Sequence, residues 1–591
     1  MSNPPLSTRN LLIAIWGHLS RRRRIQLALL LVVMLASGAA ELVSLGSVLP
    51  FLAVLSDPQR LWQQPMIQAL AARVGFTQAH QLLVPATAAF ATAAVLAALI
   101  RIANLWLNGR LAAAVGSDLS CEAYRRSLYQ PYGVQVQRNS STVITASTKQ
   151  INNTVLALTY FLQLITAVVV SLGLLTGLML IDWSAALAAV GVFGSVYGLL
   201  AITTNRELQR NSQRIVLASQ QQIQALQEGL GAIRDILLDG SQATYLEIYR
   251  RADRPQRQLQ AKNEFLAYFP RYALEAIGML ALALLGALLV LQRGSGGAVI
   301  ALLGALALGA QRLLPAFQQA YAAWAVLKGY KSDLAGVLGL LEQPLPSQIL
   351  QVAPLSIVHG IRLECVNFSY AADLPEVLHG LDLEIRRGER VALIGTTGSG
   401  KSTIVDLLMG LLVPSSGRLL LDGLDVHDPA RPELLLGWRA NIAHVPQGIY
   451  LADSSIAENI AFGVPKNQID LERVNQAAEQ AQIASLIKSS RSGYETFVGE
   501  RGIRLSGGQR QRIGIARALY KQAKVLVLDE ATSALDKRTE KDVMDAINGL
   551  SKELTIVIIA HRMSTVASCD RVVVIEQGLV RRIQSLSSID C

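Results

Sequence analysis

The sequence has few charged residues and few cysteines for its length. Asp, Glu, Lys and Arg make up 16% of its 591 residues, whereas hydrophobic residues make up 51%. This balance is typical of a membrane protein. The four cysteines are far apart and lack the close spacing of metal ligands, so we expect free thiols and no thiolate metal centre. A chain of this length is expected to form two or more domains.

The charge is also distributed unevenly along the chain. Residues 1–350 carry 27 Lys and Arg against 15 Asp and Glu, whereas residues 351–591 carry 27 against 28. The basic excess therefore lies in the hydrophobic half. A soluble nucleic-acid binder would carry such an excess on a polar domain, so no nucleic-acid partner is expected. The basic residues are instead expected to set membrane orientation and to meet anionic lipids.

Six apolar stretches in the N-terminal half of the chain are long enough to cross a bilayer, which takes about 20 helical residues. They predict a transmembrane domain over residues 1–345. The spans lie near residues 25–55, 82–107, 155–181, 184–204, 265–291 and 297–327. Four arginines at 21–24 precede the first span and place the N-terminus in the cytosol. After six spans the chain has returned to the cytosol.

The connections between the spans also carry information. Residues 58–76 predict an external amphipathic helix, which either lies on the outer leaflet or packs on the neighbouring protein surface. The connections after the second and fourth spans are long, rich in arginine and helical in pattern. Breaks at 130–133 and 229–231 mark where these helical hairpins turn and contact a cytosolic domain, or else are ordinary turns.

A glycine-rich loop in the second half of the chain predicts an ATP site. It follows an apolar strand at 391–394 and precedes an apolar helix that begins near Ile404. Backbone N–H groups of such a loop, together with the helix N-terminus, cradle phosphates. Lys401 is expected to reach the terminal phosphates, and the Ser402 hydroxyl to bind Mg²⁺. The loop residues are Gly395, Thr396, Thr397, Gly398, Ser399, Gly400, Lys401, Ser402 and Thr403.

Three further motifs narrow the prediction. A second glycine-rich helix start is another anion site; it consists of Leu505, Ser506, Gly507, Gly508 and Gln509. Two apolar strands, at 525–528 and 555–560, run directly into polar residues. The first runs into Asp529 and Glu530, the second into His561. Ligands of doubly wound sheets bind at the carboxyl ends of the strands, where these three side chains would emerge.

Taken together, these motifs resemble those of the ATP-binding cassette (ABC) transporters, and the resemblance covers essentially the whole chain. It implies a six-helix membrane domain of the ABC exporter fold followed by an α/β P-loop nucleotide-binding domain at 355–591, with a helical subdomain at about 450–520. It also implies an ATPase coupled to transport, with ATP and Mg²⁺ as cofactors. In this family the second glycine-rich motif, the signature, serves the ATP of the other cassette. A chain with one phosphate loop and one signature therefore implies a homodimer, a heterodimer being the alternative.

The resemblance also implies roles for single residues. Glu530 matches the general base, His561 the switch histidine and Gln447 the residue that senses Mg²⁺. Because degenerate cassettes usually lack the second acid, the presence of Glu530 implies genuine hydrolysis. Asp529, with Ser402 and Gln447, matches the Mg²⁺ ligands. The other matches are Tyr370 for adenine stacking, Glu500 for coupling, and Ser533, Ala534, Leu535 and Asp536 for the loop at the dimer interface.

Ionisable residues inside the predicted spans are candidates for substrate contacts. They include Arg101, Arg271, Glu275 and Arg312. A helical rise of about 1.5 Å per residue places the three arginines in the inner half of the membrane. Over two copies they would form a ring suited to bidentate capture of phosphate. Two alternatives are that the arginines extend to lipid phosphates, or that Arg271 pairs with Glu275 one turn further on.

Two phrases, at 40–46 and 270–278, resemble those of PglK-type flippases of lipid-linked oligosaccharides. This likeness implies transfer of an anionic amphipathic lipid, such as a polyprenyl-pyrophosphate-linked oligosaccharide, from the cytosolic to the outer leaflet by alternating access. One alternative is an exporter of hydrophobic drugs or of lipid-A-like lipids. Another is an ATP-gated channel or regulator, which would not need an intact Glu530. The expected location is a bacterial-type inner membrane, with the N-terminus and the ATPase domain in the cytosol.

Overall fold

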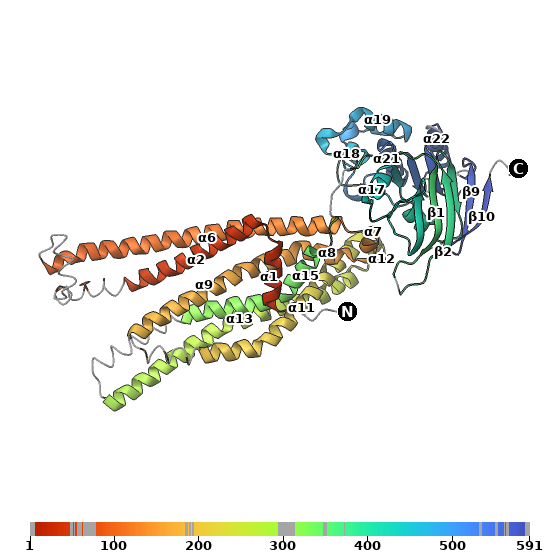
Figure 1. The fold of residues 1–591 in the computed structure, drawn as a ribbon. Coiled ribbons are helices and arrows are strands. Elements are labelled where there is room, and N and C mark those ends of the chain that lie inside the picture. Colours follow the sequence, from red (N-terminus) through yellow and green to blue (C-terminus); the bar gives the residue numbers. More distant parts are fainter. Residues whose placement is uncertain are drawn as a thin grey trace. The chain divides into compact units, whose positions relative to one another are not determined.

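The computed structural model divides the chain into two compact units (Figure 1). The first unit comprises Met1–Gln130 and Arg138–Leu345, and the second comprises Pro131–Gln137 and Pro346–Cys591. The structure describes residues 6–47, 78–181, 194–293, 314–346, 352–371, 373–530, 535–549, 553–560 and 566–585, with a few single positions between these ranges. The predicted external helix at 58–76 and most of the predicted span at 297–327 lie outside the described residues.

The first unit is helical. Its elements are α1 (Thr8–His18), α2 (Arg21–Gly46), η1 (Ala79–Leu82), α6 (Leu83–Leu128), α8 (Ser140–Thr145), the π-helix η2 (Ala146–Gln150), α9 (Ile151–Ile181), α11 (Ser195–Gly231), α12 (Ile233–Asp239), α13 (Gln242–Arg293) and α15 (Lys331–Leu341), and residues 314–329 are also helical. Among the described residues, three helical stretches are long and apolar enough to cross a membrane. They are Arg21–Ala40, Leu83–Leu128 and Ser140–Thr176.

Helix α6 is much longer than a bilayer crossing requires. The 46 residues of α6 span about 69 Å, whereas the hydrocarbon core is about 30 Å thick. The helices pack in two groups. One core joins α1, α2, α6, α9 and α15, and another joins α11, α13 and the helical residues 314–329. In Figure 1, α2 and α6 run side by side, and so do α11 and α13.

The hairpin between α11 and α13 turns later than its sequence indicates. A break at 229–231 is present, since α11 ends at Gly231 and Ala232 leaves the helical conformation. The short helix α12 follows, and the left-handed residue that ends it is Gly240, with φ of 64°. The turn between the two long helices is therefore at Gly240. A glycine is suited to this position because it adopts positive φ without steric cost.

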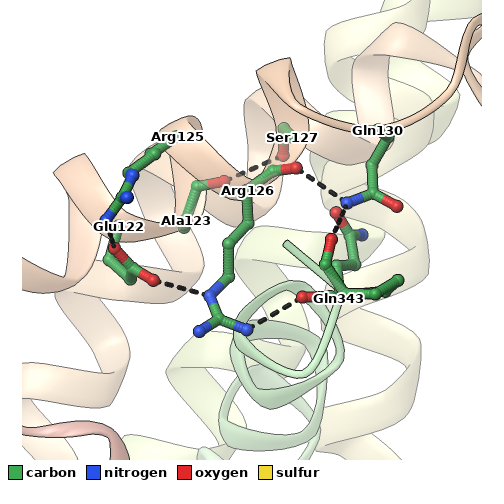
Figure 2. Close-up of polar contacts among 8 residues, drawn as sticks. Glu122, Ala123, Arg125, Arg126, Ser127, Gln130 and Gln343 are labelled. Carbon is green, nitrogen blue, oxygen red and sulfur yellow. Dashed lines mark hydrogen bonds and ion pairs between the residues drawn. The ribbon is translucent and has the colours of Figure 1, made fainter. Parts of the chain in front are cut away.

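The C-terminal end of α6 is hydrogen-bonded to the residues that follow α15 (Figure 2). Arg126 donates one hydrogen bond to Glu122 (2.6 Å) and another to the carbonyl of Gln343 (2.8 Å). The Gln130 amide donates to the carbonyls of Arg126 (2.9 Å) and Pro344 (3.0 Å). The end of α6 and the start of the linker to the second unit are thus joined by charge-assisted and neutral hydrogen bonds, so that they are expected to move together.

The carboxyl group of Asp333 is buried in the first turn of α15 and is 3% exposed. Burial raises its pKa to about 7, despite a hydrogen bond from Asn153 and the nearby charge of Lys149. The folded protein therefore binds a proton at this site between pH 4 and 7, where the unfolded chain does not. By linkage, the free energy of unfolding decreases as the pH rises through this window.

We expect Asp333→Asn to stabilise the protein at pH 8 and to have little effect at pH 4. The gain has an upper bound of about 4 kcal/mol, at about 1.4 kcal/mol for each unit of pKa shift. Thermal unfolding of reconstituted protein at both pH values measures it. The matched control is Glu342→Gln, at the exposed end of the same helix. An equal effect of Asp333→Asn at pH 4 and pH 8 would contradict the assignment.

The second unit contains two sheets. An antiparallel sheet has the order β2-β1-β4-β5, and a mostly parallel sheet has the order β10-β9-β3-β8-β7-β6. The strands are β1 (Gly360–Phe368), β2 (Leu378–Arg386), β3 (Arg390–Ile394), β4 (Ser416–Leu421), β5 (Leu424–Asp425), β6 (Ile442–Val445), β7 (Val525–Asp529), β8 (Thr555–Ile559), β9 (Arg571–Glu576) and β10 (Leu579–Ser585). β8 is buried throughout, as expected of a central parallel strand covered on both faces.

Helices cover these sheets and form a separate helical region. They are α7 (Tyr132–Gln137), α16 (Lys401–Leu408), α17 (Pro432–Ala440), α18 (Ile456–Ile460), η4 (Lys466–Gln468), α19 (Leu471–Gln480), α20 (Ala484–Ser489), η5 (Gly493–Glu495), η6 (Glu500–Gly502), α21 (Gly507–Tyr520) and α22 (Lys537–Asn548). α18, α19, α20 and α21 share one core with β6, β7 and β8. The predicted strands at 391–394, 525–528 and 555–560 thus correspond to β3, β7 and β8.

Helix α7 comes from the connection between the second and third predicted spans but belongs to the second unit. Its Gln137 amide donates a hydrogen bond to the carbonyl of Tyr370 (2.5 Å). A methyl group added to Gly133 would lie 3.8 Å from the side chain of Leu412. The prediction that the chain turns near 130–133 to contact the nucleotide-binding domain is confirmed.

Candidate functional site

The phosphate loop lies between β3 and α16, as the sequence predicts. Two of its glycines are required by its geometry. A Cβ on Gly395 would lie 2.1 Å from the Ile575 carbonyl oxygen, and Gly400, the N-cap residue of α16, has φ of 98°. Any larger residue at position 395 would clash with backbone that cannot give way. The two glycines therefore allow the tight turn that keeps the N–H groups of the loop on its inner side.

Lys401 and Ser399 both have side chains placed to bind an anion. The Lys401 side chain is 6% exposed, and its ammonium donates to the carbonyls of Gly395 (2.9 Å) and Thr396 (2.8 Å). The Ser399 hydroxyl is buried and has no hydrogen-bond partner among the described residues. A buried hydroxyl without a partner is costly, and a phosphate oxygen would satisfy it. The loop thus fits the nucleotide that its sequence predicts.

The carboxyl ends of β6 and β7 bring Gln447 and Glu530 together, 83 positions apart in the chain. The Gln447 amide donates to Oε2 of Glu530 at 2.9 Å. Glu530 has φ of 47°, a left-handed conformation that costs a non-glycine residue about 1–3 kcal/mol and is concentrated at functional sites. Asp529 precedes it as the last residue of β7. This strained position directs the expected base towards the residue expected to sense the metal.

The oxygen donors at this edge fit Mg²⁺. Ser402, Gln447 and Asp529 supply a hydroxyl, an amide carbonyl and a carboxylate, which are the hard ligands that this ion prefers. Asp406, on α16, was not identified from the sequence. Burial and the charge of Asp529 raise its pKa to about 6. A second acidic group beside Asp529 could have been suspected only from the third dimension, because nothing in the spacing from Lys401 marks it.

Tyr370 lies beside the phosphate loop. Its hydroxyl is 3.0 Å from that of Thr403 on α16, and its ring meets Phe368 edge-on with centroids 5.0 Å apart. Its carbonyl accepts the hydrogen bond from Gln137 of α7. The residue expected to stack on adenine therefore contacts both α16 and α7 within the second unit. The sequence did not single out Gln137.

The signature residues begin α21. Ser506 and Gln509 form a capping box: the Ser506 hydroxyl accepts from the Gln509 N–H (3.2 Å), and the Gln509 amide oxygen accepts from the Ser506 N–H (2.9 Å). Leu505, Gly507 and Gly508 complete the turn. No hydrogen bond joins residues 505–509 to residues 395–403, all of which the structure describes. Within the described residues, the signature and the phosphate loop of one chain thus share no hydrogen bond.

The remaining predicted residues of this unit are placed as follows. Glu500 is the exposed first residue of η6, next to Arg501 with φ of 52°. Leu535 is buried, and Asp536 caps α22 by accepting from the Thr539 N–H at 3.1 Å. His561, Ser533 and Ala534 lie outside the described residues.

The candidate substrate residues of the first unit lie on two helix groups. Arg101 on α6 is exposed and donates to the Ala97 carbonyl at 3.3 Å. Arg271 on α13 is exposed, with its guanidinium 5.8 Å from the centre of the Tyr272 ring. It makes no ion pair with Glu275 in the described chain. The alternative that Arg271 pairs with Glu275 one turn further on is therefore not supported. Arg312 lies outside the described residues.

The chain is similar to known transport proteins. Residues 378–533 match the family model described as ABC transporter. The chain is 33% identical over 467 residues to an ATP-dependent lipid A-core flippase of Chromohalobacter salexigens, covering 78% of both proteins. It is 40% identical over 248 residues to an ATM1-type heavy metal exporter of Novosphingobium aromaticivorans, covering 42% of this chain and 40% of that protein. A solved bacterial Atm1-family ABC exporter with ATP bound has a TM-score of 0.75 and 25% identity, covering 96% of this chain and 95% of that one.

Proposed function

The chain belongs to the ABC transporters, and from this premise we propose that it is a flippase that moves a phosphorylated glycolipid from the cytosolic to the outer leaflet. The chain is an integral membrane protein whose ATPase domain is coupled to transport. Several similar proteins are named ATP-dependent lipid A-core flippases, which supports a lipid cargo. The proposed location is the inner membrane, with the N-terminus and the ATPase domain in the cytosol.

The cargo is proposed from the chemistry of the membrane domain. Exposed Arg101 and Arg271 have no ion-pair partner among the described residues. A charge in a membrane span without a protein partner is expensive unless a ligand or water meets it. Lipid A-core and polyprenyl-pyrophosphate glycans share the phosphate group that guanidinium binds with two parallel hydrogen bonds. The phrases at 40–46 and 270–278 favour the polyprenyl class, whereas the named relatives favour the lipid A class.

The proposed active unit is a pair of identical chains. Arg101 and Arg271 lie on different helix groups, and the signature of one chain shares no hydrogen bond with its own phosphate loop in the described residues. A second copy supplies the missing half of both sites. Each nucleotide would then lie between the loop of one chain and residues 505–509 of the other, which makes closure of the pair depend on ATP.

The proposed chemistry follows from the geometry of the loop. Lys401 exchanges two carbonyl partners for phosphate oxygens, and the N–H groups at the start of α16 hold the charge that develops in the transition state. Glu530 leaves the Gln447 amide and accepts the proton of the attacking water. A Mg²⁺ ion held by Ser402, Gln447 and Asp529 would supply charge neutralisation on the phosphates. Opening after hydrolysis resets the membrane domain.

ATPase activity in lipid nanodiscs tests the cargo. We expect stimulation by lipid A-core or by a polyprenyl pyrophosphate, but not by phosphatidylcholine. Arg101→Ala and Arg271→Ala should each raise the half-maximal concentration by about 10- to 100-fold, because each removes charged hydrogen bonds worth about 1.5–3 kcal/mol. Basal turnover should stay within about twofold, since neither residue touches the nucleotide.

Arg214→Ala is the control, because Arg214 is an exposed arginine of α11 beyond the predicted span. It should leave stimulation unchanged. If both cavity variants keep native stimulation by every phosphorylated lipid, phosphate recognition by these arginines is wrong. Stimulation by uncharged hydrophobic drugs alone would favour the drug-exporter alternative.

A further inference from the structure

The first turns of α2 and the middle of α6 line a cavity that the proposed transport cycle does not use. Its volume is about 510 Å³, and both helices form its wall. The wall of the cavity has an apolar part and a positively charged part. It is apolar at Leu29, Val33 and Leu107, whereas Arg22 and Arg110 supply it with a pair of guanidinium groups.

These two arginines are available for a ligand. The neighbouring Arg23 is already occupied, because its Nε lies 2.7 Å from Oδ2 of Asp118 on α6 and thereby joins the two helices. Within the described chain, neither Arg22 nor Arg110 has a hydrogen-bond or ion-pair partner. The Arg110 guanidinium instead lies 4.9 Å from the centre of the exposed Trp106 ring. The cavity therefore has a net positive rim without an internal counter-charge.

Its position along the helices matches the headgroup level of a membrane. The arginines at 21–24 come directly before the apolar stretch of α2, and Trp106 and Arg110 come where the apolar stretch of α6 ends. Tryptophan and arginine are both enriched at the membrane–water boundary. The apolar wall then continues from this level towards the hydrocarbon core, where an acyl chain would lie.

We propose that this cavity binds one anionic phospholipid of the cytosolic leaflet, with its phosphate at Arg22 and Arg110 and an acyl chain along Leu29 and Val33. The proposal rests on the cytosolic orientation of the N-terminus given above. Charge complementarity selects the occupant, because an anionic headgroup neutralises the rim, whereas the ammonium of a zwitterionic lipid would be repelled. The lipid would be a resident ligand and not the cargo, since neither Arg101 nor Arg271 lines its site.

Trp106 provides a direct readout of occupancy. The full-length protein is reconstituted without nucleotide in vesicles that contain acyl-brominated phosphatidylglycerol or brominated phosphatidylcholine at equal mole fraction. The protein has six tryptophans, so the signal of Trp106 is the difference between native protein and Trp106→Phe. We expect brominated phosphatidylglycerol to quench Trp106 at least about threefold more than brominated phosphatidylcholine.

The variants separate a built site from general charge. Arg22→Gln should bring the quenching ratio of the two lipids close to one. Arg21→Gln removes the same charge from the adjacent position, which does not line the cavity, and should keep the ratio. Arg101→Ala should also keep the quenching ratio, because Arg101 belongs to the proposed transport site and not to this cavity. A failure of the lipid proposal can therefore be told apart from a failure of the proposed function. Millimolar inorganic phosphate should not abolish the preference if the acyl chain is required.

Four outcomes would overturn the proposal. Equal quenching by the two lipids in native protein would mean that the cavity does not select an anionic headgroup. An equal effect of Arg21→Gln and Arg22→Gln on the quenching ratio would mean that general surface charge, and not the cavity, causes the preference for phosphatidylglycerol. Complete competition by inorganic phosphate would assign the site to a free anion. If neither lipid quenches Trp106, protein covers the cavity, and the lipid assignment is wrong.

Discussion

Glu530→Gln is expected to lower ATP turnover by about 10²- to 10⁴-fold, the range that a general base contributes. Glutamine has nearly the same shape, so the contact with Gln447 at 2.9 Å can persist and the strained backbone at position 530 need not change. What is lost is the group that accepts the proton of the attacking water. ATP binding should therefore remain, since Lys401 and the loop N–H groups are untouched.

Two measurements check this expectation. Phosphate release at saturating ATP gives the loss of turnover, and retention of radiolabelled ATP after gel filtration gives the binding. With ATP and Mg²⁺ the variant should accumulate as a closed pair that native protein visits only transiently. Glu553→Gln, at an exposed carboxylate near the opposite ends of the strands, is the matched control and should turn over normally. Turnover above a tenth of native in Glu530→Gln would remove Glu530 as the base.

The second large effect concerns which chain completes each nucleotide site. We expect pairs that carry Lys401→Ala on one chain and Ser506→Arg on the other to retain one ATP. Pairs that carry both changes on one chain beside a native chain should retain none. The reason is that a site made from the loop of one chain and the signature of the other stays intact only when the two defects fall on the same site.

Mixed pairs are isolated with a different affinity tag on each chain, and ATP retained per pair is counted in the Glu530→Gln background. Ser506 caps α21, so Ser506→Ala, which removes the cap but adds no bulk, controls for loss of helix stability. The reverse pattern, with retention only when both changes share a chain, would show that each chain completes its own site. It would then remove the need for a second copy.

Much of the nucleotide site could be predicted because its components are local. A strand, a glycine-rich turn and a helix follow one another within 14 residues, so the pattern at 391–404 is sufficient to place the loop. The capping box at Ser506 and Gln509 is likewise a three-residue relation. The apolar runs that became β7 and β8 are buried parallel strands, and such strands read as continuous hydrophobic sequence.

Other features depend on contacts between distant positions. Nothing near Asp406 indicates that Asp529 lies beside it, or that Gln447 and Glu530 share a hydrogen bond. The pairing of Arg271 with Glu275, which helical spacing suggests, is not found among the described residues, where the Arg271 guanidinium lies beside the Tyr272 ring. The hairpin turns at Gly240, although the glycines at 229–231 gave the stronger local signal.

The sequence by itself determined the division into a membrane domain and a nucleotide-binding domain, the class of the nucleotide site and the start of its helices, because each is encoded in neighbouring residues whose preferences act over a few positions. Only the tertiary structure decided that α7 packs with the second unit through Gln137 and Tyr370. It also decided that Arg23 pairs with Asp118, whereas Arg22 and Arg110 have no hydrogen-bond or ion-pair partner in the described part of the chain. Such choices depend on which side chains packing brings within hydrogen-bond reach, and that is a property of the whole fold.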